Sequence, residues 1–229
     1  VLANIYLHYA YDLWAHQWRN RHAQGNVVVV RYADDTVVGF QHLDDAERFL
    51  SDLKERLRKF ALDLHPGKTR LIEFGRFALP NRKAKRLGKP ETFDFLGFTH
   101  ICGKNRKGGF LIRRQTVRKR LKEKLCQVKE TLRRMMHIPI PEQGQYLARV
   151  LNGFFNYYAV PTNSRAINSF YRHVGWYWFR TLRRRSQTSK LTWERMKRLT
   201  DKWLPPARLR HPLPDMRFDV TTRGRSPVR

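Results

Sequence analysis

A short apolar stretch near the start of the chain strongly restricts how that part can fold. Residues 27–30 are four consecutive valines, a β-branched run that is typical of a strand buried on both faces. A second strand-like run covers residues 36–40, and Asp34 and Asp35 lie between the two runs. Two such runs separated by a few polar residues predict an antiparallel hairpin with both acidic side chains at its tip.

Further helices and strands are predicted around this hairpin. Apolar spacing predicts one helix over residues 2–22 and a second that Asp44 or Asp45 caps and that ends at His65. The first helix places five residues roughly on one face: Leu2, Tyr6, Tyr9, Leu13 and Gln17. The remaining pattern indicates a strand over residues 70–74, a basic loop over 80–91, and a second hairpin formed by 93–98 and 109–112 around the loop 103–108.

Beyond Arg113 the pattern changes to helix. Apolar residues recur there at steps of three and four, namely Val117, Leu121, Leu125, Val128, Leu132 and Met135. Further helices are predicted over residues 143–159, 163–185 and 192–203, and the Pro- and Arg-rich tail from Pro205 has no periodicity. The fold class is therefore α+β, with hairpins and helices first, an all-helical part second, and a soft boundary near residue 113.

The chain is strongly basic, with 47 Lys and Arg against 19 Asp and Glu and a formal net charge of +28. Residues 1–100 carry 16 basic and 12 acidic side chains, whereas residues 101–229 carry 31 and 7. A hydrophobic content of 41% argues against a disordered chain. A polyanionic partner is therefore expected, and it should bind the helical part.

Cysteine content and hydropathy exclude several other classes of protein. Cys102 and Cys126 are too few and too far apart for a zinc ribbon or a disulfide framework, which favours reduced thiols in a reducing compartment. The sequence has no apolar stretch of about 18 residues for a membrane span and no secretory signal. It begins with Val1 inside a helical pattern, which suggests an unusual start codon or a chain cut from something longer.

Two adjacent aspartates at a hairpin tip can hold divalent metal. Two-metal phosphoryl transfer needs carboxylates that keep the ions roughly 3.5–4 Å apart, and Mg²⁺ suits a site with few protein carboxylates. The simpler interpretation is that Asp34 and Asp35 are good turn formers, which is what an isolated Asp-Asp pair most often is.

Several segments, in the expected order, resemble the reverse transcriptases encoded by group II introns. Arg31-Tyr32-Ala33-Asp34-Asp35-Thr36 resembles the active-site motif of that family. The other matching segments are residues 2–8, Leu62 to Thr69, Phe93 to Phe98, and Leu151 to Tyr158, the last of which resembles the maturase-specific domain. The closing residues Arg223 to Arg229 fit the tails of bacterial members.

This resemblance implies an RNA-directed DNA polymerase and maturase, with roles for particular residues. Asp34 and Asp35 would be catalytic and would hold Mg²⁺, Lys68 would lie near the nucleotide phosphates, and Phe95, Leu96 and Gly97 would support the primer. The solvated-lysine alternative for Lys68 stays open, and a P-loop is excluded because residue 62 is Leu rather than Gly. The implied partners are intron RNA, an RNA/DNA template-primer and deoxynucleotide triphosphates in the bacterial cytoplasm, with no membrane and an unknown oligomeric state.

The same resemblance divides the chain into four parts. They are an incomplete palm over residues 1–112, a thumb-like basic helix over 113–140, a maturase-specific helical domain over 141–204, and a basic tail over 205–229. The cations expected to bind RNA are Arg118, Lys119, Lys122, Arg133, Arg134, Arg183, Arg184 and Arg185. A solvated charged face is the alternative for residues 117–136, and the aromatic residues 171–179 are expected to be core.

The sequence also departs from the family pattern. The third metal-binding aspartate, the fingers and a Gln-Gly segment should precede Val1, so we expect negligible polymerase activity from these 229 residues alone. No His/Cys-rich endonuclease segment follows residue 203. Two alternatives therefore stay open: a non-catalytic RNA-binding splicing factor, and a degenerate remnant that folds poorly because its sheet exposes apolar surface.

Overall fold

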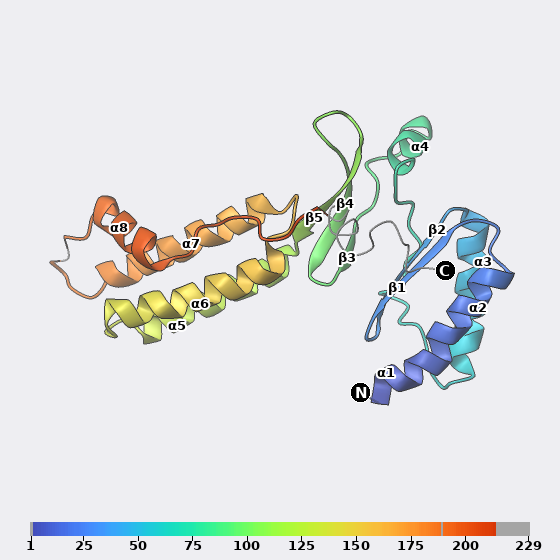
Figure 1. Ribbon diagram of the computed structural model, residues 1–229, viewed down its shortest axis with the longest axis horizontal. Helices are drawn as coiled ribbons and strands as arrows, with labels where there is room; N and C mark the ends of the chain where they lie inside the picture. Colours follow the sequence, from blue (N-terminus) through green and yellow to red (C-terminus); the bar gives the residue numbers. More distant parts are fainter. Residues whose placement is uncertain (1, 189, 214–229) are drawn as a thin grey trace. The chain divides into compact units, whose positions relative to one another are not determined.

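The structure, a computed structural model, describes residues 2–188 and 190–213. The chain divides into two compact units, Val1–Phe74 and Gly75–Arg229 (Figure 1). The predicted tail motif at Arg223 to Arg229 lies outside the described residues. Among the described helices, none is long and apolar enough to cross a membrane.

The first unit is a two-stranded hairpin with helices packed on one face (Figure 1). Its elements are α1 (Leu2–Leu7), the π-helical turn η1 (His8–Asp12), α2 (Leu13–Arg21), β1 (Val27–Tyr32), β2 (Asp35–Phe40) and α3 (Leu43–Arg58). The strands pair antiparallel, with Val27 opposite Phe40 and Tyr32 opposite Asp35. The predicted hairpin is therefore confirmed, with a turn of only two residues.

Burial in this unit differs from the sequence prediction in two places. The predicted shared face of the first helix is exposed, because the side chains that reach the core are instead Tyr11, Ala15 and Trp18. The π turn η1 widens the helix there, which changes the helical phase between α1 and α2. The prediction of a strand buried on both faces is also wrong, because Val28 and Val30 are 62% and 45% exposed.

The segment after the hairpin is less regular than predicted. Helix α3 buries its apolar stripe as expected but ends at Arg58 rather than His65. The N-cap position is occupied by His42, while the buried Asp45 accepts hydrogen bonds from the backbone of Gln24 and Gly25. Asp45 thus holds the loop before β1 instead of capping its own helix. Residues 70–74 form no strand.

The second unit begins with a short helix and a three-stranded antiparallel sheet. The helix α4 (Ala78–Ala84) occupies part of the segment predicted to be a loop. The strands β3 (Phe93–Phe95), β4 (Phe98–Lys104) and β5 (Phe110–Thr116) pair in that order, so the predicted second hairpin gains a third strand. Leu96 and Gly97 form the turn between β3 and β4 with φ of 49° and 77°, the backbone that a two-residue hairpin requires.

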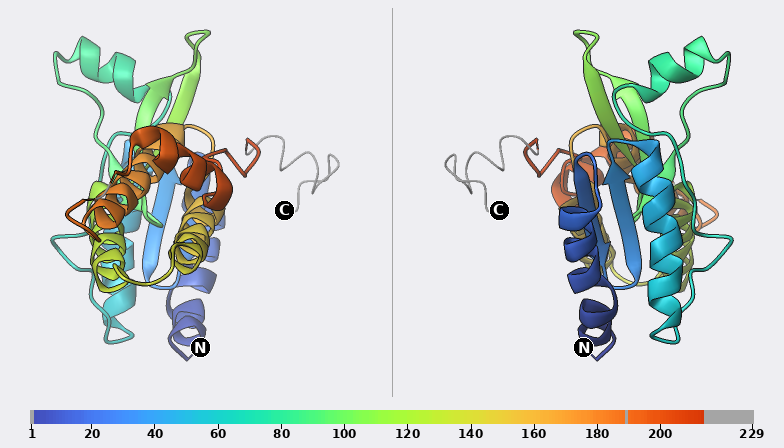
Figure 2. Two further views of the ribbon diagram at one scale, coloured as in Figure 1. Left: turned by 90° about the vertical axis from the view of Figure 1, so that its left-hand side faces the viewer. Right: turned by 90° about the vertical axis from the view of Figure 1, so that its right-hand side faces the viewer.

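A helical bundle completes this unit. It consists of α5 (Arg118–Arg134), α6 (Ile140–Tyr158), α7 (Ser164–Arg183) and α8 (Trp193–Trp203), and Figure 2 shows several of these helices nearly end-on. The predicted stripe on α5 is confirmed, because Leu125, Val128 and Leu132 are buried in the bundle core. The buried Trp178 donates a 2.8 Å hydrogen bond to Gln143, so its indole N–H is satisfied inside the core.

The sheet and the bundle are joined by hydrogen bonds from the loop between α6 and α7. The amide of the buried Asn163 accepts from the Thr116 backbone at 3.0 Å and donates to the Thr116 hydroxyl at 2.8 Å. Thr162 accepts from the Arg114 backbone at 2.9 Å. The compact units divide between Phe74 and Gly75, and the four named domains of the sequence prediction stay predictions.

Two glycines of α6 give a matched pair of stability predictions. An added Cβ at Gly144 would lie 2.6 Å from the Trp203 ring, whereas one at Gly153 would meet nothing within 4 Å. We expect Gly144→Ala to lower the free energy of unfolding by about 1–3 kcal/mol through overpacking, and Gly153→Ala to raise it by up to about 1 kcal/mol through helix propensity. Urea unfolding of the full chain measures both, and equal effects of the two changes would contradict this packing.

Candidate functional site

The hairpin tip of the first unit presents two carboxylates to solvent. Ala33 and Asp34 form the turn, and Asp35 is the first residue of β2. Ala33 has φ of 54°, which is uncommon for a residue with a side chain. Both Asp34 and Asp35 are exposed, and neither takes part in the ion pairs of the described residues.

Arg31 anchors this turn to the preceding helical segment. Its guanidinium donates to both carboxylate oxygens of Asp12, at 2.6 and 2.5 Å, and to the Ala33 carbonyl at 2.7 Å. A bidentate pair of this kind fixes orientation as well as distance. Arg31 therefore ties the backbone of the strained turn to η1, and it helps to set the position of the adjacent carboxylates.

The ion pair between Arg31 and Asp12 gives a pH prediction. Hydrogen bonding from the Arg31 guanidinium lowers the pKa of the Asp12 carboxyl. Because the folded pKa is depressed, the pair stabilises the fold above the unfolded pKa of about 4, and this contribution is lost as pH falls through the folded pKa. We expect Asp12→Asn to lower the free energy of unfolding by about 1 kcal/mol at neutral pH.

Urea unfolding at a series of pH values checks this expectation. The difference between the parent chain and Asp12→Asn should be constant above about pH 5 and should shrink below about pH 4. The exposed Asp63 serves as control, because Asp63→Asn should change stability little at any pH. A difference that persists unchanged at pH 2 would show that Asp12 acts through packing rather than charge.

The acidic tip offers only part of a metal site. In residues 2–188 and 190–213, no group of three or more His, Cys, Asp or Glu side chains is placed to hold a metal ion. Two neighbouring exposed carboxylates still suit Mg²⁺, which takes one or two protein carboxylates and keeps several waters. The donor set fits the ion in kind but includes no third carboxylate.

Lys68 lies in the same unit, in a turn after α3. The backbone amides of Lys68 and Thr69 both donate to the carbonyl of His65, at 3.1 and 2.9 Å. The side chain of Lys68 is exposed, so it is accessible to an anionic ligand.

The turn formed by Phe95, Leu96 and Gly97 belongs to the second unit, where the helical bundle holds it. The Tyr157 hydroxyl donates to the Leu96 carbonyl at 2.8 Å, and the Val117 amide donates to the Gly97 carbonyl at 3.0 Å. A Cβ at the buried Gly97 would lie 2.9 Å from the Tyr158 hydroxyl. The turn therefore has a fixed backbone and a requirement for glycine.

The segment from Leu151 to Tyr158 lies in α6 and performs mainly structural tasks. Its apolar and aromatic members other than Tyr157 belong to the bundle core or pack against it. The side-chain oxygens of Asn152 and Asn156 accept hydrogen bonds from the Arg210 guanidinium, at 2.6 and 2.5 Å. The Arg210 backbone amide also donates to the carbonyl of Ala159, so this motif fastens the chain that follows α8 along α6.

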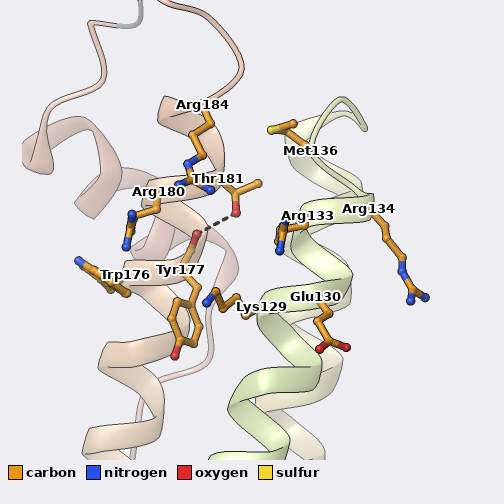
Figure 3. A pocket seen from close by; sticks show the side chains of 10 residues that line it. All are labelled: Lys129, Glu130, Arg133, Arg134, Met136, Trp176, Tyr177, Arg180, Thr181 and Arg184. Atoms are coloured by element: carbon orange, nitrogen blue, oxygen red, sulfur yellow. Dashed lines mark hydrogen bonds between the residues drawn. The ribbon is translucent and has the colours of Figure 1, made fainter.

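Cationic side chains gather in a groove between α5 and α7 (Figure 3). We call this cavity of about 1000 Å³ the α5–α7 groove; its lining residues are Lys129, Glu130, Arg133, Arg134, Met136, Trp176, Tyr177, Arg180, Thr181 and Arg184. Five of these side chains are cationic and one is anionic. Such a concave surface with cations on both walls can hold a polyanion.

The structure separates the predicted RNA-binding cations into four groups, of which Arg185 is the last. Arg133, Arg134 and Arg184 meet in the α5–α7 groove. The exposed Arg118, Lys119 and Lys122 lie toward the other end of α5. Arg183 lies over the Phe179 ring at 5.7 Å.

Arg185 forms a contact within the fold. It donates a hydrogen bond to the Ile138 carbonyl, and desolvation lowers the pKa of its guanidinium. The contact joins the end of α7 to the turn after α5. Part of its hydrogen-bonding capacity is therefore used inside the protein.

The expectation that the aromatic residues 171–179 are core is wrong for Trp176, which is 41% exposed and lines the groove, and Arg180 was not predicted as a member of it. Trp176 and Arg180 in α7 and its C-cap residue Arg184 recur at steps of four residues, which places them on one side of the helix. The sequence contains that spacing, but the same spacing is also typical of a solvent-exposed helix face that binds nothing. The identity of the facing helix, α5, came only from the structure.

Comparison with known families addresses the first part of the chain. Residues 1–100 match the family described as reverse transcriptase (RNA-dependent DNA polymerase). No curated protein matches the chain. The match includes the acidic hairpin, the turn at Lys68 and the turn at Leu96, and it ends before the helical bundle.

Proposed function

We propose, from the reverse transcriptase domain over residues 1–100, that this chain is part of a group II intron reverse transcriptase and maturase. It would bind intron RNA, assist splicing and, within the full-length protein, contribute to RNA-templated DNA synthesis. The observation that supports RNA binding is the α5–α7 groove, which is lined by five cationic side chains and only one acidic side chain. Clustered cations of this kind supply most of the affinity for nucleic acid.

In the polymerase reaction the acidic hairpin would hold Mg²⁺. Asp34 and Asp35 would provide ligands, and the metal would neutralise charge that develops during phosphoryl transfer. Lys68 would lie near the phosphates of the incoming nucleotide. The turn at Leu96 and Gly97 would support the primer end, a task that suits its fixed backbone.

A second function, RNA binding and splicing without catalysis, is favoured by a separate observation. The described residues place no third potential metal ligand beside Asp34 and Asp35. The helical bundle has its own buried core, and its cations do not depend on the acidic hairpin. On this alternative Asp34 and Asp35 contribute neither to RNA binding nor to splicing.

A splicing assay with the purified chain tests the proposal. The RNA is the intron transcript that surrounds the coding sequence, at a Mg²⁺ concentration where it splices slowly alone. We expect the chain to increase spliced product, and we expect the combined change of Arg133→Ala and Arg184→Ala to abolish the increase. The double change of Asp34→Ala and Asp35→Ala should leave it intact.

A competing RNA in the same assay tests whether the chain prefers the intron to other RNAs. An unrelated structured RNA of equal length, present at equal concentration, should compete for the groove only in part, so that most of the increase in splicing remains. No increase in splicing, together with equal binding of both RNAs, would contradict the maturase function. Primer-extension activity would then be the remaining test of the reverse transcriptase function.

A further inference from the structure

The α5–α7 groove contains an aromatic side chain that the bundle core does not use. Trp176 is 41% exposed, whereas Trp178, two residues later on α7, is fully buried. The Arg180 guanidinium lies 4.8 Å from the centroid of the Trp176 ring. This exposed aromatic surface lies inside a cationic cavity.

We infer that the α5–α7 groove binds single-stranded RNA, with an unpaired base stacked on the Trp176 indole and neighbouring phosphates on Arg133, Arg180 and Arg184. The inference deepens the proposed function and rests on it, because it names the form of RNA that the groove accepts. Figure 3 shows the two walls: Trp176 and Arg180 come from α7, Arg184 follows its last residue, and Arg133 comes from α5.

The aromatic side chain separates single strands from duplexes. Cations bind the phosphates of both forms, so the charge of the groove does not discriminate between them. An indole gains stacking energy only from a base whose face is free, and bases in an A-form duplex are already stacked on their neighbours. Unpaired loops and ends can turn a base outward, so only they can stack a base on Trp176.

The chemistry of the groove also predicts tolerance to base sequence. Every base has a π-face, so stacking on Trp176 does not require a particular base. Arg180 places its guanidinium over one face of the same ring, which leaves the other face for a base and keeps the cation near the adjoining phosphate. Tyr177, whose ring centroid lies 5.4 Å from that of Trp176, widens the aromatic surface.

The experiment measures binding of two labelled RNAs by the full chain. One is a single strand of about 12 pyrimidines, a length within the usual range of such sites, and the other is a blunt duplex of the same length. Fluorescence anisotropy gives Kd for each RNA. We expect Trp176→Ala to weaken single-strand binding about tenfold or more, and to change duplex binding less than about twofold.

Two further variants make the result specific. Trp176→Phe keeps an aromatic ring and should retain most of the single-strand affinity, while Phe77→Ala removes a 69% exposed aromatic side chain outside the groove and should change neither Kd. Arg180→Ala should weaken both RNAs, because it removes a phosphate contact.

The outcomes separate this inference from the proposed function. Equal loss of single-strand and duplex affinity on Trp176→Ala would overturn the inference while RNA binding by the chain stood. Loss of affinity on Trp176→Phe equal to that on Trp176→Ala would also overturn it, because the effect would not come from stacking. Failure of the unaltered chain to bind either RNA would instead contradict the proposed function.

Discussion

Alanine at both Asp34 and Asp35 is expected to lower nucleotide incorporation on the order of a thousandfold, because metal stabilisation of phosphoryl transfer contributes several kcal/mol. The measurement requires a protein in which residues 1–229 are joined to the fingers and upstream palm segment of a related reverse transcriptase. Primer extension on an RNA template with Mg²⁺ gives the rate.

The exposed Glu47 provides a control in the same unit, because Glu47→Ala should leave primer extension unchanged. RNA binding by the double variant should equal that of the parent, since the α5–α7 groove contains neither aspartate. Primer extension that survives the double change would contradict the metal-binding assignment. A parallel loss of RNA binding would indicate damage to the fold rather than to the metal site.

Salt is expected to weaken RNA binding about a hundredfold between about 50 and 200 mM. The estimate follows from about five phosphate contacts, which match the five cations of the α5–α7 groove, and from a slope of about −0.7 per contact in a log–log plot for single strands. A titration of Kd against KCl concentration measures this slope directly.

The groove can be compared with other cations of the same unit. The triple change of Arg133, Arg180 and Arg184 to Ala should reduce the slope by about 2. The matched control replaces three exposed cations outside the groove, Arg165, Lys197 and Arg198. If both triple variants reduced the slope equally, RNA would be binding to the general charge of the bundle rather than to the groove.

The regular elements of the fold were largely predictable because each has a local pattern. The valine run and its following strand specified a hairpin, and the stripe through Leu125, Val128 and Leu132 specified α5. The face of the first helix was not predictable, because the π turn η1 changes the helical phase without a distinctive residue. Residues 70–74 have the composition of a strand, but they belong to neither of the described sheets.

The sequence predicted which cations belong to the helical part, but it did not predict which of them lie together in space. Composition identified the cations of the helical part, yet Arg133 and Arg184 are about 50 positions apart in sequence and meet only because α5 packs on α7. Arg185 is the next residue and has the same side chain as Arg184, but it is held inside the fold by its hydrogen bond to the Ile138 carbonyl. The difference between these two arginines depends on helical phase and on the turn that follows α5.

The hydrogen bonds around Leu96, Gly97 and Asn163 determine how many nucleotides of a bound RNA would lie between two points of the protein. They join the β3–β4 turn and β5 to the bundle at several points, so the turn and the α5–α7 groove keep a constant separation. A strand that occupied both would span a fixed number of nucleotides. Nuclease footprints should then end at one sharp distance from the primer terminus, whatever the sequence of the RNA between them.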